Sequence, residues 1–231
     1  MKTIMEEDIL IMEKPAASGY NELIELLHKA YSRHTRKGIM FPAACQTAEE
    51  TGRIEKNNIC FIALKGAELV GTITYCPPGS FKQNRKWYAG PNPAKFFRFA
   101  VNPEIQGMGI GTKLLRHIYE RAERDGAREL LLDTADGIGW LLKFYSRQGF
   151  RLVDYISWPN TNYYSVIMCK RIGKNNHLPP LKCRVSYCAA KIFCIMKYNS
   201  NGRPRRWYRL SHKAKQILIN FKEVFYRCRR V

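Results

Sequence analysis

Three glycines alternate in the segment QGMGIGT, residues 106–112, at Gly107, Gly109 and Gly111. An apolar run, residues 96–101, precedes them, and apolar residues at helical spacing follow, so the segment joins a strand to a helix. The first turn of a helix carries unpaired backbone N–H groups and partial positive charge, and glycines let a bulky phosphate approach the backbone. The pattern predicts a pyrophosphate site.

The spacing of this turn separates it from two well-known phosphate motifs. A nucleotide P-loop needs Lys-Ser or Lys-Thr after its last glycine, whereas Gly111 is followed by Thr112-Lys113. The dinucleotide fingerprint needs G-x-G-x-x-G, and the spacing here is G-x-G-x-G. Gln106 can add a side-chain amide and Thr112 a hydroxyl to such a site. A plain flexible turn with spare glycines is the structural alternative.

Two segments together resemble the GCN5-related N-acetyltransferase (GNAT) superfamily. Residues 106–111 match motif A of that family, Q/R-x-x-G-x-G/A, and the strand end 99–103 stands in its usual place. Residues 142–150, LKFYSRQGF, look like its motif B helix, in which an aromatic-Tyr pair precedes a Gly-Phe turn. The element order agrees over residues 9–171, so the resemblance covers that part of the chain.

The resemblance implies an enzyme that transfers an acetyl group from acetyl-CoA, or a related acyl-CoA, directly to a primary amine of a small-molecule or peptide acceptor. The strand Phe99–Val101 is expected to splay from its neighbour after Val101, to pair with the pantetheine amides, and to present an N–H of Val101 to the thioester oxygen. The implied cofactor residues are Phe99, Ala100, Val101, Gln106, Gly107, Met108, Gly109, Ile110, Gly111 and Thr112. A degenerate domain that binds CoA without turnover is the alternative.

Two proton transfers need side chains. Tyr145 matches the family's tyrosine that protonates the leaving thiolate, and simple aromatic packing is its alternative role. Asp133 is expected to point into the cleft and accept the proton of the acceptor amine, with Glu104 as a second candidate; either could be a surface carboxylate. Where the family often has Asn, this chain has Ile138.

Two other residues near Ile138 could supply the contact to the pantetheine arm that the family's Asn makes, and these are Thr134 and Asp136. Two loops, residues 34–47 and 79–95, are expected to shape the acceptor pocket. The second loop is basic and aromatic, which suits an acceptor that carries a carboxylate or phosphate, although a solvated loop would look the same. Its residues of interest are Lys82, Arg85, Lys86, Trp87 and Tyr88.

Alternating strand and helix patterns predict an α/β fold with a mixed sheet. Strands are expected at residues 9–14, 59–66, 68–79, 96–101, 128–136, 150–158 and 163–170. Helices are expected from a cap at Ser18, over 47–57 with Thr47 and Glu50 as a capping box, after the glycine turn to about 125, and over 138–148.

Charge divides the chain of 231 residues unevenly. Residues 1–171 hold 24 Lys and Arg against 18 Asp and Glu, a balance of +6, whereas residues 172–231 hold 15 against one, a balance of +14. We therefore expect an N-acetyltransferase domain at 1–171, a linker at 172–180 and a small basic amphipathic, helical extension at 181–231. The extension could pack on its own domain or on a homodimer partner, or bind anionic lipid or nucleic acid.

The remaining composition favours a cytoplasmic protein with reduced thiols. The N-terminus carries acids and no apolar signal region, and no apolar run is long enough to cross a bilayer. Cys183, Cys188 and Cys194 lie close together without a histidine or fourth cysteine at a usual zinc spacing. The sequence therefore predicts no metal site.

Overall fold

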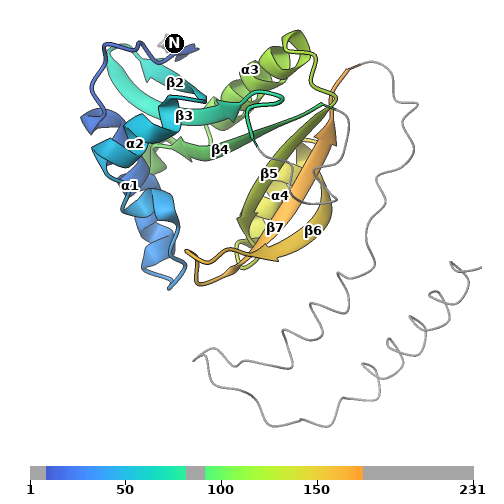
Figure 1. Ribbon diagram of the computed structural model, residues 1–231. Coiled ribbons are helices and arrows are strands. Elements are labelled where there is room, and N and C mark those ends of the chain that lie inside the picture. The colour runs from blue at the N-terminus through green and yellow to red at the C-terminus, as the bar shows by residue number, and fades with distance from the viewer. Residues whose placement is uncertain (1–8, 82–91, 174–231) are drawn as a thin grey trace, which may run out of the picture. The chain divides into compact units, whose positions relative to one another are not determined.

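The computed structural model describes residues 9–81 and 92–173 of the chain, and Figure 1 shows their arrangement. Helices and strands follow one another in the order that the sequence predicts. They are β1 Ile9–Glu13, α1 Asn21–Thr35, α2 Ala48–Glu55, β2 Ile59–Lys65, β3 Glu68–Cys76, β4 Pro93–Val101, α3 Ile110–Arg124, β5 Glu129–Ala135, α4 Gly139–Arg147, β6 Arg151–Ser157 and β7 Tyr164–Arg171. Short 3-10 turns at Pro42–Ala44 and Pro103–Ile105 were not predicted.

The seven strands form one sheet in the order β1-β2-β3-β4-β5-β7-β6. Among the described strands, β4 and β5 form the parallel pair, and the other neighbours are antiparallel. The predicted mixed α/β sheet is therefore confirmed.

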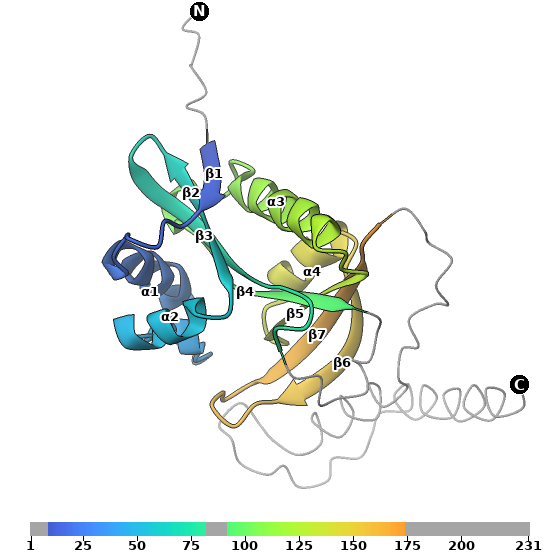
Figure 2. The same ribbon diagram turned by 45° about the horizontal axis from the view of Figure 1, so that its top comes forward.

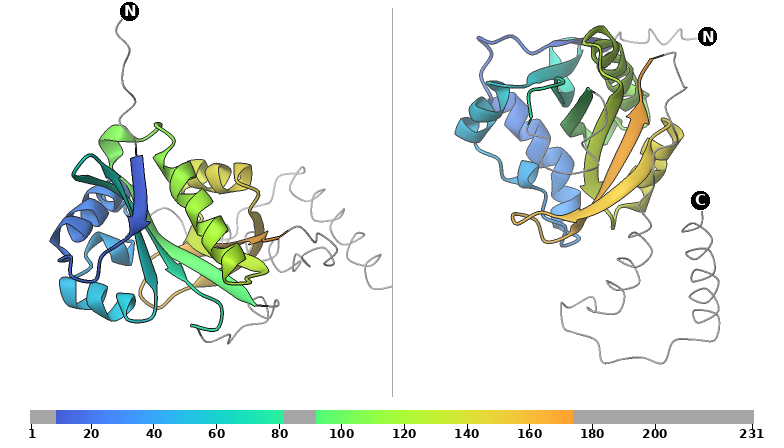
Figure 3. Two further views of the ribbon diagram at one scale, coloured as in Figure 1. Left: turned by 90° about the horizontal axis from the view of Figure 1, so that it is seen from above. Right: turned by 45° about the vertical axis from the view of Figure 1, so that its right-hand side comes forward.

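Helices cover both faces of the sheet, as Figures 2 and 3 show. On one face, Leu23, Leu27 and Ala30 of α1 pack with β2 residues and with Ala100 of β4. On the other face, the apolar stripe of α3 and the aromatic residues of α4 pack in the larger core. The layers place the end of β4 between α1 on one side and α3 and α4 on the other.

The two predicted helix caps had different outcomes. The capping box is confirmed, because the Thr47 hydroxyl accepts from the Glu50 N–H and the Glu50 carboxylate accepts from the Thr47 N–H. The cap at Ser18 is wrong, since α1 begins after Tyr20 and has no side-chain cap. Ser18 lies instead in a turn closed by its N–H and the carbonyl oxygen of Pro15, so the helix starts only after that turn.

Strand β4 begins earlier than predicted and also separates earlier from β5. Its first residues, Pro93–Lys95, pair with Glu129–Leu131 of β5, although the sequence placed them in a loop. Pairing with β5 ends at Lys95, so the expectation that separation follows Val101 is wrong. The physical reason is a bulge: opposite β3 the register shifts between Ala100 and Phe97, and Arg98 adopts a φ of 49°.

Several predictions concern residues outside the described ranges. These are the basic loop residues at 82–88, the three neighbouring cysteines and nearly all of the predicted linker and extension, 174–231. They stay predictions. Within the described residues, no helix is long and apolar enough to cross a membrane, and no group of three or more His, Cys, Asp or Glu could hold a metal ion.

Candidate active site

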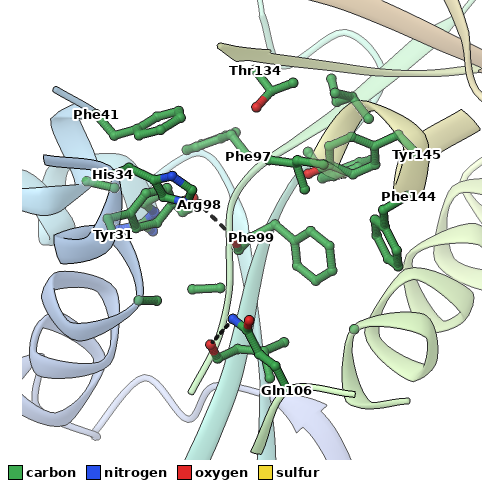
Figure 4. A pocket seen from close by; sticks show the side chains of 18 of the residues that line it. Tyr31, His34, Phe41, Phe97, Arg98, Phe99, Gln106, Thr134, Phe144 and Tyr145 are labelled. Carbon is green, nitrogen blue, oxygen red and sulfur yellow. Dashed lines mark hydrogen bonds between the residues drawn. The ribbon is translucent and has the colours of Figure 1, made fainter. Parts of the chain in front are cut away.

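A cavity of about 570 Å³ lies between α1, β4, the glycine turn, the end of β5 and the start of α4. Figure 4 shows its lining, with Gln106 near the glycine turn and Thr134 near the far end. All but one of the predicted cofactor residues line it, namely Phe99, Ala100, Val101, Gln106, Gly107, Gly109, Ile110, Gly111 and Thr112. Met108 is 54% exposed and is not part of the lining.

The three glycines of the turn are required for two different reasons. Gly107 and Gly109 have φ values of +95° and +76°, and a Cβ built on either meets no atom within 4 Å. Their conformation favours glycine, and the space over the turn is open for a ligand. Gly111 lies at the start of α3, where a Cβ would be 3.1 Å from Cζ of Phe99. It is needed for close packing of the helix on β4.

One edge of β4 is free of strand partners beyond Lys95. The N–H of Asn102 donates to the carbonyl oxygen of Val70 at 2.9 Å. Because hydrogen bonds alternate along an antiparallel pair, Ala100 faces β3, and the backbone groups of Phe99 and Val101 face the cavity. The strand therefore presents the kind of edge that an extended, amide-containing ligand can pair with.

Both carbonyl oxygens of this edge already accept hydrogen bonds from side chains. The Tyr31 hydroxyl donates to the Phe99 oxygen, and Nε2 of Gln106 donates to the Val101 oxygen, both at 3.1 Å (Figure 4). The Gln106 amide thus bonds the strand in this structure, whereas the sequence suggested that it faces a phosphate. The N–H groups of Phe99 and Val101 are the remaining polar groups of this edge.

Arg33 at the end of α1 connects three walls of the cavity. Its guanidinium donates to Oε1 of Gln106 at 2.8 Å and lies 4.6 Å from the centroid of the Trp140 ring on α4. His34 stacks on the same indole at 6.2 Å. Burial, together with the charges of Arg33 and Lys37, lowers the pKa of His34 to about 4, so its ring is neutral at pH 7.

Tyr145 lies in the cavity wall and is 4% exposed. Its ring is 6.0 Å from the Phe96 ring and 6.3 Å from the Phe99 ring. Burial, with smaller contributions from Tyr31 and Asp133, raises its pKa well above the usual value. Tyr145 therefore presents a protonated hydroxyl in the lining of the cavity.

The two candidate bases occupy different surroundings. Asp133 at the end of β5 lines the cavity, and its Oδ2 accepts a 3.1 Å hydrogen bond from the Trp158 indole. Tyr31, Tyr145 and Tyr163 line the same cavity, and burial, with a smaller contribution from the charge of Asp133, raises the pKa of each phenol. Glu104 is paired with Lys29 at 2.9 Å and does not line the cavity, so only Asp133 is in position.

The half of the cavity beyond β4 has aromatic walls that were not predicted. Tyr31 of α1 lies 5.0 Å from Phe41, and Phe41 lies 5.0 Å from Tyr163 of the loop before β7. Of the two loops that the sequence indicated, residues 34–47 do supply His34 and Phe41, and most of residues 79–95 lie outside the described ranges. Tyr163 was missed because it is 122 positions from Phe41, and no local pattern joins them.

Asn162 joins the two loops that carry these aromatic residues. Its Nδ2 donates to the Gly38 oxygen at 2.7 Å, and its Oδ1 accepts from the Met40 N–H at 3.0 Å. The loop between β6 and β7 is therefore bonded to the loop between α1 and α2. Of the residues suggested in place of the family's Asn, Thr134 lines the cavity and Asp136 does not.

Comparisons with known proteins show the family of this chain. Residues 20–150 match the model of a family described as the acetyltransferase (GNAT) family. S-(2-succino)cysteine N-acetyltransferase of Bacillus subtilis (strain 168) is 31% identical over 134 residues, which are 56% of this chain and 76% of that protein. S-alkylcysteine N-acetyltransferase of the same organism is 27% identical over 138 residues, 57% of this chain and 73% of that protein.

A solved structure shares the fold. It is a GNAT family acetyltransferase from Elizabethkingia anophelis with acetyl-CoA bound, and it matches with a TM-score of 0.53 at 17% identity. The match covers 72% of this chain and 100% of the other.

Proposed function

Because this chain belongs to the GNAT family of acetyltransferases, we propose that it transfers an acetyl group from acetyl-CoA directly to the primary amine of a small-molecule acceptor. The observation that carries this proposal is that the glycine turn, the free edge of β4 and Tyr145 line one cavity. These are the parts needed to hold a diphosphate, an extended amide-containing arm and a leaving thiolate.

The donor would lie along β4 with its diphosphate at the turn. The backbone N–H groups of residues 106–112 would bind the diphosphate over Gly107 and Gly109, where the space is open. The arm would then follow the free edge toward Phe99. To pair with the Val101 oxygen it must displace the Gln106 amide, which makes the same bond in this structure.

The reacting atoms would lie where the strand edge approaches Tyr145. The acceptor amine attacks the thioester carbon, the carbon–sulfur bond breaks, and the thiolate takes a proton from Tyr145. A backbone N–H of the free edge, that of Phe99 or of Val101, stabilises the oxyanion; Val101 was the sequence prediction. Asp133 accepts the proton that the ammonium loses before attack, and the nitrogen loses a second proton as the amide forms, which reprotonates the Tyr145 phenolate.

The acceptor half favours an amine with an apolar substituent. Tyr31, Phe41 and Tyr163 supply aromatic surface, and Asp133 supplies a negative charge for an ammonium group. Two relatives are named for acetylation of S-substituted cysteines. We therefore propose S-substituted cysteines as the first acceptors to test.

The test is release of CoA thiol from acetyl-CoA in the presence of S-methylcysteine or S-benzylcysteine, with the N-acetyl product identified by mass spectrometry. Gly109→Glu should abolish acetyl-CoA binding in calorimetry, since it adds charge and strain at the turn. Gly66→Glu is the matched control: Gly66 has a φ of +59°, its Cβ would meet nothing within 4 Å, and it lies outside the cavity lining. Equal loss in both variants, or no binding by the unaltered protein, would refute the donor site; binding without any product would favour a CoA-binding module.

A further inference from the structure

Three charged side chains form a buried cluster behind the acceptor half. Lys14 approaches Glu55 at 3.4 Å, and NH2 of Arg98 approaches the other oxygen of Glu55 at 3.8 Å. The Lys14 and Arg98 side chains are each 4% exposed and that of Glu55 is 16% exposed. The cluster holds two cations and one anion, so it carries one uncompensated positive charge.

The uncompensated charge belongs to Arg98. Lys14 has the shorter contact to Glu55, donates to the Ser18 oxygen at 2.9 Å and lies over the Tyr20 ring. Arg98 donates from Nε to the Thr74 hydroxyl at 3.0 Å, but neither of its terminal nitrogens has a hydrogen-bond partner in the described structure. A buried guanidinium whose two terminal nitrogens lack hydrogen bonds is costly, and such groups in native proteins call for an explanation.

Arg98 belongs to the cavity wall, beside Tyr31 (Figure 4). The charged residues in the described lining are Arg33, Arg98 and Asp133. Arg33 already bonds Gln106 and stacks on Trp140, and Asp133 suits an ammonium group. Arg98 is therefore the lining cation whose two terminal nitrogens are both buried without a hydrogen-bond partner.

We propose that the terminal nitrogens of Arg98 bind a carboxylate of the acceptor, so that the enzyme selects amines that carry a carboxylate. The inference rests on the proposed acetyl transfer and adds the substrate class. Both nitrogens are shielded from solvent in this structure, so the side chains that cover them rearrange when the acceptor binds. The carboxylate neutralises the surplus charge and accepts two hydrogen bonds from the guanidinium.

Four probe amines separate the possible positions of that carboxylate. S-Methylcysteine has it next to the amine, S-carboxymethylcysteamine has it at the far end, and S-methylcysteine amide and 2-(methylthio)ethylamine have none. The unaltered enzyme should show kcat/KM about 10- to 100-fold higher for at least one carboxylate than for the neutral amines. The better of the two acids identifies which carboxylate binds. Equal values for all four amines would overturn the proposal and leave acetyl transfer intact, whereas no product from any amine would reject both.

The variant Arg98→Met should bring the ratio of acid to neutral amine close to one, mainly through KM of the acid. Arg98→Lys, which keeps the charge but loses the two-pronged donor, should give an intermediate ratio. Arg53→Gln is the control, because Arg53 is an exposed arginine paired with Glu49 outside the cavity lining, and it should keep the full ratio. An unchanged ratio in Arg98→Met contradicts the proposal.

Thermal unfolding separates ligand binding from a structural role. Arg98→Met leaves the Lys14–Glu55 pair neutral, so the variant should melt at the same temperature as the parent or higher. Glu55→Gln leaves two buried cations and should melt lower. If Arg98→Met instead melts well below the parent and loses activity equally on all four amines, Arg98 is a structural residue and the proposal is wrong.

Discussion

The Tyr31 hydroxyl donates a hydrogen bond to the carbonyl oxygen of Phe99 at 3.1 Å, across 68 positions of sequence. This bond attaches α1 to the part of β4 that has left β5. It holds the strand edge that would receive the donor arm, and it connects the donor and acceptor halves of the cavity.

Changing Tyr31 to Phe should weaken both stability and donor binding. The Phe99 oxygen loses its donor, which costs about 1–3 kcal/mol of unfolding free energy if no water replaces it. The KM for acetyl-CoA should rise because the edge is less fixed. Tyr119→Phe is the matched control, since the Tyr119 hydroxyl also donates to a carbonyl, that of Gln148 at 3.4 Å, outside the cavity lining. It should affect chemical denaturation alone; a parallel rise of KM would contradict the role given to Tyr31.

Changing Tyr145 to Phe should lower kcat about 10²- to 10⁴-fold with little change in KM for acetyl-CoA. The raised pKa of Tyr145 keeps the acid protonated, so no loss of activity from its ionisation is expected below pH 10. Steady-state rates between pH 6 and pH 10 check both points. A Phe variant with full kcat would show that Tyr145 only packs.

Asp133→Asn should lower kcat most at acidic pH, where the acceptor amine is protonated.

His34 should make the protein sensitive to acid. Its pKa is about 4 in the folded protein and about 6.5 when unfolded, so the unfolded state binds the proton first as the pH falls. Its stabilising contribution is complete above about pH 6.5 and is lost progressively toward pH 4. His34→Gln should flatten the decline of melting temperature over this range. Some decline should remain, because burial also lowers the pKa of His117. An identical pH profile in the variant would disprove the assignment.

The two types of glycine at helix starts can be told apart. Gly111→Ala should destabilise by about 1–3 kcal/mol, because the new Cβ would meet the Phe99 ring at 3.1 Å. Gly139→Ala, at the start of α4, meets nothing within 4 Å and should be neutral or stabilising by about 0.4–1 kcal/mol. Urea unfolding of both variants measures the difference, and calorimetry with acetyl-CoA should show weaker binding in Gly111→Ala alone. Equal stabilities would show that the Phe99 ring shifts to accommodate the new Cβ without a cost in stability.

The parts of the site that the sequence predicted are those encoded locally. The glycine turn is a contiguous segment, and Asp133 and Tyr145 stand at the ends of elements whose periodicity is clear. Arg98 could not be predicted, because it stood in the apolar run 96–101 and the bulge that redirects it depends on pairing with β3. Tyr31 packs on the apolar face of α1. Its bond to Phe99 depends on how that helix lies across the sheet.

Contacts beyond the local pattern also explain why the predicted starts of α1 and β4 were wrong. Ser18 is a favourable cap residue, but the turn closed at Pro15 delays the helix to Asn21. Pro93–Lys95 lacked the pattern of a strand because their partners in β5 come 36 positions later. Both depend on contacts between distant segments, which a local pattern does not contain.

The amide of Asn162 has a consequence for how this enzyme could change its acceptor. It bonds Gly38 and Met40, so the walls contributed by residues 36–47 and by residues 158–163 are one mechanical unit. Replacing either loop alone with the corresponding loop of a relative would break both hydrogen bonds. The aromatic rings would then no longer be held in fixed positions. New acceptor ranges should therefore be inherited, or engineered, by exchanging the two loops as a pair, with the donor half left untouched.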